Sequence, residues 1–335
     1  MQRAASQKVT VVILALSSLL SALPSKLMVE VKRLNRYFGS LKAVNNVSFQ
    51  IGRGQVFGFI GPNGAGKTTT MRILATIDVP TSGDATIDGY SVVNDPDKVR
   101  RIIGFMPDHF ATYPNVNCWE YVDFYARAYG LRGKARLTAV RRVMTFTELD
   151  GLAEKAIDGL SKGMKQRLCL ARAMIHDPKV LILDEPAAGL DPRARIELRE
   201  LIKLLAAEGK AILISSHILT ELAEMCGVVG IIELGQIVAT GPVDAIQATS
   251  RTIAVMEIRV LRDPELVERW LGEQPDVDDV EVSGRNITFH FPAGEESQAA
   301  LLDRMSAAKL PLVSFRSREE NLEDVFMAVT KGKVQ

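Results

Sequence analysis

The sequence has few cysteines and few aromatic residues, and its charges nearly cancel. Its 335 residues include three cysteines, which lie far apart and form no C-x-x-C pair: Cys118, Cys169 and Cys226. This usage argues against a disulfide framework or a zinc site and favours buried thiols in a reducing compartment. Lysine and arginine number 41 against 40 for aspartate and glutamate, so the composition gives no global electrostatic reason to expect nucleic acid as a partner.

The sequence also lacks a comfortable membrane span. The apolar stretch VTVVILALSSLLSAL covers only residues 9–23, whereas a spanning helix needs roughly 20 apolar residues. It resembles the apolar region of a signal peptide, although no A-x-A-like cleavage site follows. Three interpretations of residues 1–27 stay open: an extension irrelevant to the fold, with translation beginning at Met28; a helix that anchors the chain at a membrane surface; or an export signal.

The clearest chemical motif lies in residues 56–70, VFGFIGPNGAGKTTT. A short apolar strand runs into a glycine-rich turn that fits G-x-x-x-x-G-K-[ST] and opens a helix expected from Lys67 towards Ile77. The glycines allow backbone angles that a Cβ would penalise, so successive N–H groups can converge on an anion. We therefore predict a nucleotide triphosphate site with Mg²⁺, in which Lys67 reaches the β- and γ-phosphates and Thr68 ligates the metal. The candidate residues of the turn are Gly61, Pro62, Asn63, Gly64, Ala65, Gly66, Lys67, Thr68 and Thr69.

Two aromatic residues precede this turn. Strands are expected at residues 29–34 and 44–51, with Tyr37 and Phe38 in the loop between them. A ring at this place could stack on an adenine base, because every base offers a π face. A core aromatic between the two strands is an equally good interpretation.

A second helix start, LSKGM at residues 160–164, offers another anion-binding site. Ser161 is a good N-cap, and Gly163 leaves the backbone N–H groups accessible. Short motifs of this kind are common, and its position gives it weight: it precedes VLILDEP at residues 180–186. That apolar run is typical of a strand buried on both faces.

The strand predicted at 180–183 ends in two carboxylates. The carboxyl ends of strands line the ligand crevice in open α/β sheets, so we expect Asp184 to hold Mg²⁺ and Glu185 to polarise a water. A turn containing Asp191 and a helix over 192–207 follow. The next apolar strand ends at His217, which we expect at the same sheet edge and in contact with a phosphate.

Asp108 follows an apolar run at 101–106 that we expect to lie beside the strand preceding the phosphate turn. Its carboxylate could then approach both Mg²⁺ and the attacking water. The alternative is that Asp108 merely caps the following turn, since aspartate is a common turn residue. The loop that it opens contains Phe110 and Tyr113, and exposed aromatic residues suit a protein docking groove.

Residues 251–335 form a separate unit. Their apolar pattern reads β-α-β-β-α-β, which suggests a small ferredoxin-like domain. A final helical stripe over residues 322–329 follows a capping box of Ser317 and Glu320. The unit contains no catalytic constellation, so we expect a role in packing or regulation.

Residues 28 to about 250 resemble the ATP-binding subunit of an ABC transporter, whose diagnostic motifs all occur here in order. The resemblance implies that two copies, identical or different, pair head to tail. Ser161 and Gly163 of one copy would then cover the phosphates bound by the other. Asp191 would lie across that interface, and His217 would contact the γ-phosphate.

The implied fold is α/β: a P-loop ATPase domain with a mixed sheet and a helical subdomain, then the small α+β ferredoxin-like domain. The implied function is ATP hydrolysis at the cytoplasmic face of the membrane, where the chain drives export through a separate permease. The rival is an ABC protein that clamps ribosomes or DNA, but such proteins usually carry two ATPase domains or long coiled-coil insertions. A P-loop kinase or GTPase would leave residues 160–164 without a purpose.

Two features depart from the family pattern. The second helix start reads LSKGM where the family usually has LSGGQ, so Lys162 and Met164 are substitutions. Asp108 stands where the family usually has a glutamine that senses Mg²⁺ and couples to the membrane subunit. Aspartate is also an oxygen ligand, but it is shorter and negatively charged.

Overall fold

The computed structural model describes residues 26–109, 115–218, 222–243, 245, 253–292 and 294–318. Residue contacts divide the chain into two compact units, the larger running to Val243 and the smaller covering Asp244–Ala328. This division falls seven residues before the boundary expected after residue 250. The apolar stretch at 9–23, the aromatic loop at 110–114 and the stripe at 322–329 all lie outside the described residues.

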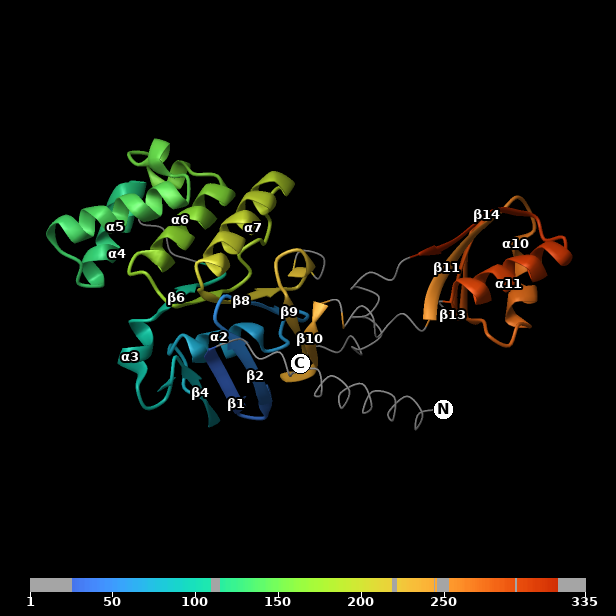
Figure 1. The fold of residues 1–335 in the computed structure, drawn as a ribbon, viewed down its shortest axis with the longest axis horizontal. Helices are drawn as coiled ribbons and strands as arrows, with labels where there is room; N and C mark the ends of the chain where they lie inside the picture. The colour runs from blue at the N-terminus through green and yellow to red at the C-terminus, as the bar shows by residue number, and fades with distance from the viewer. Residues whose placement is uncertain are drawn as a thin grey trace. The chain divides into compact units, whose positions relative to one another are not determined.

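The larger unit is organised around a six-stranded sheet of order β10-β9-β3-β8-β7-β6 (Figure 1). All neighbouring pairs are parallel except β10 and β9. Every residue of β3 and β7 is buried, as expected for apolar strands covered on both faces. The strands are β3 (Val56–Ile60), β6 (Ile103–Met106), β7 (Val180–Leu183), β8 (Ala211–Ser216), β9 (Val228–Glu233) and β10 (Gln236–Pro242).

A second, antiparallel sheet of order β2-β1-β4-β5 completes the core of this unit. Its strands are β1 (Leu27–Phe38), β2 (Leu41–Gly52), β4 (Ser82–Ile87) and β5 (Tyr90–Ser91). The expected loop position of Tyr37 and Phe38 is wrong, because both residues still pair with β2 at the end of β1. The first strand is longer than predicted because it pairs with two neighbours at once.

The helices include a helical layer formed by α4, α5 and α6, which contact one another (Figure 1). This is the helical subdomain that the resemblance implied. The helix after the phosphate turn ends at Leu74 rather than near Ile77, since Thr76 adopts a left-handed φ of 58°. The helices of the unit are α2 (Lys67–Leu74), α3 (Pro96–Arg100), α4 (Cys118–Ala128), α5 (Gly133–Phe146), η1 (Asp150–Leu152), η2 (Ile157–Gly159), α6 (Lys162–Met174) and α7 (Pro192–Ala207).

Strand β6 does not lie beside β3, as the sequence led us to expect. It is an edge strand and is separated from β3 by β7 and β8. Its outward carbonyl groups are nevertheless covered by one side chain of α6 and one from the turn that follows this helix. Arg172 donates to the Phe105 carbonyl at 3.3 Å, and the His176 Nε2 lies 2.8 Å from the Ile103 carbonyl oxygen.

The smaller unit has the predicted β-α-β-β-α-β order, with an antiparallel sheet of order β12-β13-β11-β14. It has a hydrophobic core of its own, which leaves Leu266 of the first helix 52% exposed. Ser317 lies within β14, so the proposed cap at this residue does not open a helix. The elements are β11 (Ile253–Val260), α10 (Pro264–Gly272), β12 (Asp278–Ser283), β13 (Asn286–Pro292), α11 (Glu295–Ala307) and β14 (Leu312–Arg318).

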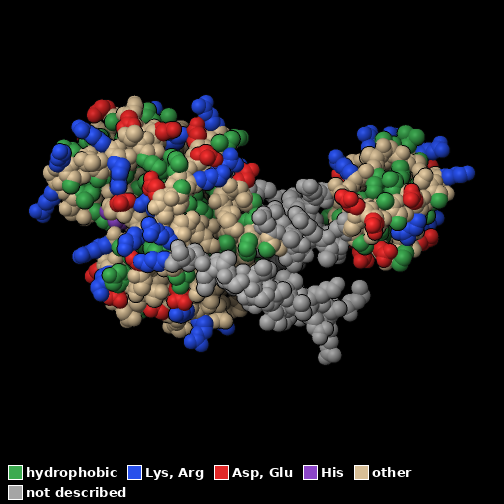
Figure 2. Space-filling view, viewed as in Figure 1, with side chains coloured by type: hydrophobic (Ala, Val, Ile, Leu, Met, Phe, Trp, Pro, Cys, Tyr) green, Lys and Arg blue, Asp and Glu red, His purple; other side chains and the backbone are tan. Residues whose placement is uncertain are grey.

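The last features of the fold are the distribution of surface charge and the apolar character of the helices. On the face shown in Figure 2, basic and acidic side chains are interspersed over each unit. Within the described ranges, no helix combines the length and apolar character that a membrane crossing requires.

Candidate functional site

The glycine-rich turn connects β3 to α2, and close backbone packing determines its residue types. Gly66 is the N-cap of α2 with a φ of 102°, and a Cβ there would lie 2.2 Å from the Ala43 carbonyl oxygen. Gly61 needs no left-handed φ, contrary to expectation. Its constraint is steric, because a Cβ would lie 2.3 Å from the Ile232 carbonyl oxygen. Neither position therefore accommodates a side chain.

The Lys67 ammonium lies inside this turn and is almost fully buried. It donates to the carbonyl oxygens of Gly61 at 2.7 Å and Pro62 at 3.2 Å. Burial lowers the pKa of Lys67, and the nearby carboxylate of Glu185 opposes that shift. An ammonium held by carbonyl oxygens in a cradle of backbone N–H groups is suited to meet an anion.

Asp184 directly follows β7 and is 1% exposed. The Ser215 hydroxyl donates to its Oδ1 at 2.6 Å, and the Thr68 hydroxyl also hydrogen-bonds the carboxylate. Burial raises the pKa of Asp184, these two hydrogen bonds oppose the rise, and the negative charges of Glu185 and then Asp108 add to it. Asp108 is thus near enough to Asp184 to raise the pKa of its carboxyl group, because β6 pairs directly with β7.

Glu185 is also buried, and its backbone has a left-handed φ of 48°. Its N–H donates to the Ser215 Oγ at 2.9 Å, and its Oε2 lies 2.9 Å from the His217 Nδ1. Its Oε1 forms an ion pair with the Lys67 ammonium at 3.4 Å and has no hydrogen-bond partner among the described residues. The carboxylate therefore lies between a lysine and a histidine.

The structure brings part of the predicted site together. One cluster, at the carboxyl ends of β3, β7 and β8, contains Lys67, Thr68, Asp184, Glu185 and His217. Among the described residues, no hydrogen bond or ion pair joins this cluster to Ser161, Gly163 or Asp191, which lie at the starts of α6 and α7.

Those three residues have local roles within their own chain. Ser161 caps α6 by accepting from the Met164 N–H at 3.3 Å, as predicted. Asp191 caps α7 in the same way and accepts from the Ala194 N–H at 2.9 Å. Gly163 allows close approach of the two helices, since a Cβ there would lie 3.3 Å from the Ala194 Cβ.

Phe38 lies at the end of β1 with 47% of its surface exposed. The core-aromatic interpretation is therefore wrong for this residue. The Arg36 guanidinium lies 4.4 Å from the centre of its ring, so a π face at this site already attracts a planar cation. Tyr37 is half-buried, and its hydroxyl donates to Asn35 Oδ1 at 3.0 Å.

Ser215 is the residue that sequence reasoning missed. Its hydroxyl joins the Asp184 carboxylate to the Glu185 N–H, and the residue is fully buried. The available signal was a serine at the end of an otherwise apolar strand predicted to reach the same sheet edge as Asp184.

The donor set at this edge suits Mg²⁺ bound together with a nucleotide. The described residues contain no group of three or more His, Cys, Asp or Glu side chains that could hold a metal ion alone. Mg²⁺ commonly uses one or two carboxylates and completes its octahedron with waters and substrate phosphates. The adjacent Asp184 carboxylate and Thr68 hydroxyl match that requirement.

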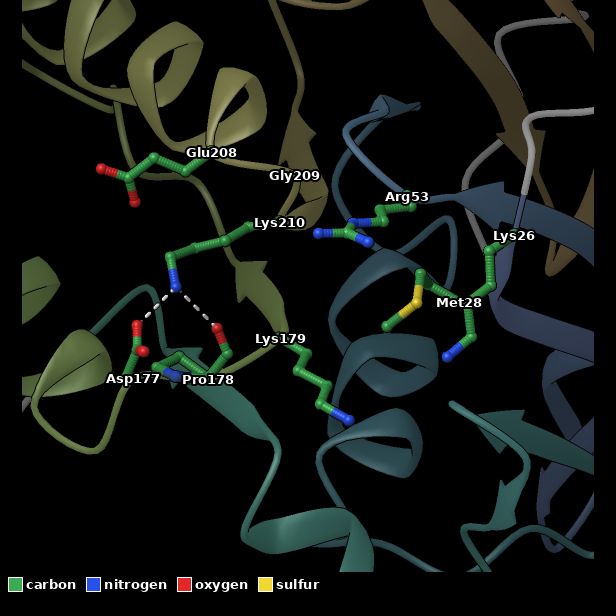
Figure 3. A pocket seen from close by; sticks show the side chains of 9 residues that line it. All are labelled: Lys26, Met28, Arg53, Asp177, Pro178, Lys179, Glu208, Gly209 and Lys210. Atoms are coloured by element: carbon green, nitrogen blue, oxygen red, sulfur yellow. Dashed lines mark hydrogen bonds and ion pairs between the residues drawn. The ribbon is translucent and has the colours of Figure 1, made fainter.

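A cavity of about 280 Å³ lies elsewhere, at the amino ends of the strands (Figure 3). Lys179 and Lys210, which line it, directly precede β7 and β8, whereas Asp184 and His217 follow these strands. The Lys210 ammonium is already occupied by Asp177 at 2.7 Å and the Pro178 carbonyl at 3.0 Å (Figure 3). This cavity is therefore separate from the carboxylate cluster.

Comparison with known proteins identifies the family. A family model described as ABC transporter matches residues 44–188, and a model of the C-terminal domain of DrrA1-3-like ATP-binding proteins matches residues 241–330. The Nod factor export ATP-binding protein I of Burkholderia lata is 32% identical over 307 residues, covering 92% of this chain and 98% of that protein. The probable multidrug ABC transporter ATP-binding protein YbhF of Escherichia coli K12 is 36% identical over 68% of this chain, but the alignment spans only 39% of that relative.

Solved structures agree with this result. One described as the ATP-binding subunit of an ABC transporter has a TM-score of 0.61 at 30% identity and covers 67% of this chain and 93% of that chain. The dimeric structure of MJ0796, a bacterial ABC transporter cassette, has a TM-score of 0.59 at 26% identity and covers 64% of this chain and 99% of that chain. The motifs, the fold and these relatives together show that the chain belongs to the ATP-binding proteins of ABC transporters.

Proposed function

We propose that this chain binds and hydrolyses ATP with Mg²⁺, pairs with a second ATPase subunit when ATP is bound, and drives export through a separate permease. The observation that carries the proposal is the buried Glu185 carboxylate, which lies between the buried Lys67 ammonium and the partly exposed His217 ring. Buried, oppositely charged groups at the carboxyl edge of a parallel sheet are what a phosphate-cleaving site requires.

In this proposal Lys67 and Glu185 change partners when the nucleotide binds. The Lys67 ammonium, now held by two carbonyl oxygens and Glu185, would turn to the β- and γ-phosphates. The Glu185 carboxylate would then be free to accept a proton from the attacking water. His217 would hold the other carboxylate oxygen and contact the γ-phosphate.

The Thr68 hydroxyl and the Asp184 carboxylate would hold Mg²⁺, which neutralises phosphate charge in such sites. Asp108 would lie beside this pair, since its charge already affects Asp184. Phe38 would stack on the adenine, while Pro62, Asn63, Ala65 and Thr69 would contribute backbone and side-chain contacts to the phosphates.

Pairing is supported by the dimeric state of the MJ0796 cassette and by the two capped helix starts. Ser161 and Gly163 of the partner subunit would cover the nucleotide, with Asp191 at the interface. Export through a permease at the cytoplasmic face of the membrane is supported by the names of the relatives. Among them is the linearmycin resistance ATP-binding protein LnrL of Bacillus subtilis, which is 30% identical over 90% of this chain and 98% of that protein. A clamp acting outside transport is the alternative and has no comparable support.

The test is Glu185→Gln, which keeps the shape of the side chain and removes the base. We expect ATP binding to be retained and hydrolysis to fall by on the order of 10²-fold or more. We also expect an ATP-dependent dimer, measured as a doubled mass by size exclusion with light scattering. Wild-type turnover in this variant would contradict the role of Glu185.

Lys67→Ala is the comparison. Loss of the buried ammonium should weaken nucleotide binding itself and prevent the dimer, measured in the same two assays. If Lys67→Ala bound ATP as tightly as the wild type, the turn would not be the phosphate site.

A further inference from the structure

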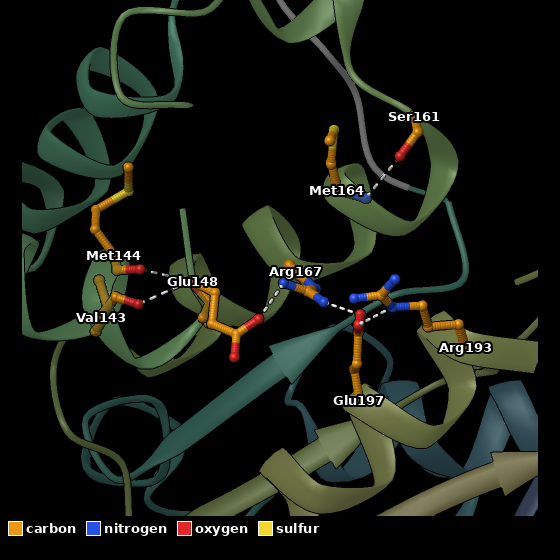
Figure 4. A network of polar contacts seen from close by, with 9 residues as sticks. Val143, Met144, Glu148, Ser161, Met164, Arg167, Arg193 and Glu197 are labelled. Atoms are coloured by element: carbon orange, nitrogen blue, oxygen red, sulfur yellow. Dashed lines mark hydrogen bonds and ion pairs between the residues drawn. The ribbon is translucent and has the colours of Figure 1, made fainter. Parts of the chain in front are cut away.

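The starts of α6 and α7 are held together by a polar network centred on Arg167 (Figure 4). The Arg167 guanidinium, only 18% exposed, forms ion pairs with Glu148 at 2.7 Å and with Glu197. Glu197 also pairs with Arg193 at 3.0 Å. Arg167 thus connects three parts of the chain: the turn after α5, the middle of α6 and the first turns of α7.

The two helices contact each other at two levels. At the first level, Gly163 approaches Ala194 so closely that a Cβ on the glycine would lie 3.3 Å from the alanine Cβ. At the second level, Arg167 binds Glu197. Residues three or four positions apart share one face of a helix, so both contacts lie on the same face of α6 and on the same face of α7. Two contacts at different heights fix the distance and the tilt between the helices.

The first residues of these helices are the ones that, in the proposed function, face the nucleotide bound by the other subunit. Ser161 and Asp191 are the N-caps of α6 and α7, and no described hydrogen bond links one to the other. Their relative position depends on the packing below them. The Lys162 side chain adds a contact at the tip, because its ammonium would lie 2.3 Å from a Cβ on Gly189.

We propose that Arg167 is a positioning residue, which through Glu197 and Glu148 sets the α6 and α7 starts as one surface that receives the nucleotide of a second copy of this chain. The inference rests on the proposed function, because it assumes that Ser161 and Asp191 face a partner. Arg167 itself touches neither the nucleotide cluster nor the N-cap side chains. It acts through the spacing of the two helices, and a planar guanidinium that binds two carboxylates suits that role better than an ammonium.

The test measures ATP-dependent dimerisation in the Glu185→Gln background, with Arg167→Met added. We expect the ATP concentration for half-maximal dimer formation to rise about five- to tenfold, because small misplacements of binding groups are costly. ATP binding to the monomer, measured by equilibrium dialysis at a protein concentration that gives no dimer, should be unchanged. Glu197→Gln should act in the same direction while leaving the pair of Arg167 with Glu148, and it covers the case in which Arg167→Met fails to fold.

Arg136→Met is the matched control, because Arg136 is 23% exposed and joins α5 to α4 through Asp123 at 2.9 Å. It should lower the thermal midpoint without changing the ATP dependence of dimerisation. The inference would be overturned if adding Arg167→Met or Glu197→Gln to the Glu185→Gln protein left the ATP concentration for half-maximal dimer formation unchanged. Absence of any ATP-dependent dimer in Glu185→Gln alone would instead overturn the proposed pairing, and the inference with it.

Discussion

Glu185 has a backbone conformation that few non-glycine residues adopt. Its φ of 48° costs on the order of 1–3 kcal/mol and is maintained only where the surroundings determine it. Here the Ser215 hydroxyl accepts from the Glu185 N–H, while His217 and Lys67 hold the carboxylate. The strained backbone directs the carboxylate into the cluster rather than along the course of β7.

Ser215→Ala should therefore affect both stability and metal use. The substitution leaves the buried Asp184 carboxylate and the Glu185 N–H without their common partner, which costs about 1–3 kcal/mol of the free energy of unfolding. We also expect the Mg²⁺ concentration for half-maximal hydrolysis to rise, because the Asp184 carboxylate loses the bond that orients it. Denaturant unfolding and a Mg²⁺ titration of ATPase activity measure the two effects.

Thr147→Ala is the control for this variant. Thr147 is also fully buried, and its hydroxyl donates to the Val143 carbonyl at 2.8 Å, far along the chain from the carboxylate cluster. It should lose stability without a change in Mg²⁺ requirement. The same Mg²⁺ curve for Ser215→Ala and the wild type would remove Ser215 from the metal site.

Asp108 permits a charge test at one position. Its side chain is 44% exposed, and its Oδ1 lies 3.6 Å from the His109 Nδ1. Its negative charge nevertheless helps to raise the pKa of Asp184. Asp108→Asn should alter the Mg²⁺ dependence of hydrolysis, because one negative charge near the metal is lost. Asp108→Gln, the usual family residue, should support hydrolysis better than Asp108→Ala. Three variants with wild-type Mg²⁺ dependence would leave Asp108 as a turn residue.

At the scale of elements, local patterns predicted the strands and helices that carry their own signals. The helix over Pro192–Ala207 and the strand over Val180–Leu183 have the expected bounds, because apolar periodicity and capping residues are local features. The position of β6 in the sheet was not predictable in the same way. Strand order depends on long crossovers, and nothing within Ile103–Met106 indicates which neighbour it pairs with.

In the candidate site, too, features with a local sequence signal were predictable, and features that depend on contacts between strands were not. Residue types and spacing predicted Lys67, Asp184, Glu185 and His217 as neighbours at one sheet edge, which the structure shows. The left-handed backbone of Glu185 and the bridging role of Ser215 depend on contacts between β7 and β8. Such contacts leave no signature in either strand alone.

The turn between β4 and β5 provides a pH-dependent test. Asp88 lies in that turn with a φ of 48°, and it accepts from Lys179 at 2.6 Å and pairs with Lys26 at 2.9 Å. The hydrogen bonds from Lys179 and Lys26 lower the pKa of Asp88, so its contribution to stability is present above the unfolded pKa of about 3.9 and is lost as the pH falls through the folded value. Asp88→Asn keeps a residue that tolerates the left-handed turn.

We expect Asp88→Asn to lose about 0.5–1 kcal/mol at pH 7, since both lysines are largely exposed. The difference from the wild type should shrink below about pH 4 and vanish in stronger acid. Urea unfolding at several pH values measures it. A deficit that stayed constant down to pH 2 would show that the ion pairs are not its cause.

At the scale of the molecule, the two units have separate cores. Every residue of the carboxylate cluster belongs to the larger unit, whose described residues run up to Val243. A chain truncated after Val243 should therefore fold and hydrolyse ATP within about twofold of the full chain, as expected when no contributing residue is removed. The same truncated chain carrying Glu185→Gln is the control for background hydrolysis. A truncated chain that failed to fold would show that the smaller unit contributes to the stability of the larger one.

The edge strand β6 has a further consequence for the behaviour of the protein in solution. An uncovered edge offers unpaired carbonyl groups to a strand of another molecule, which is a common route to aggregation. The two outward carbonyl groups of β6, those of Ile103 and Phe105, are not open to such a strand, because His176 and Arg172 already contact them. One side chain of α6 and one from the turn after it thus oppose strand addition at this edge, beside the strand that leads to Asp108.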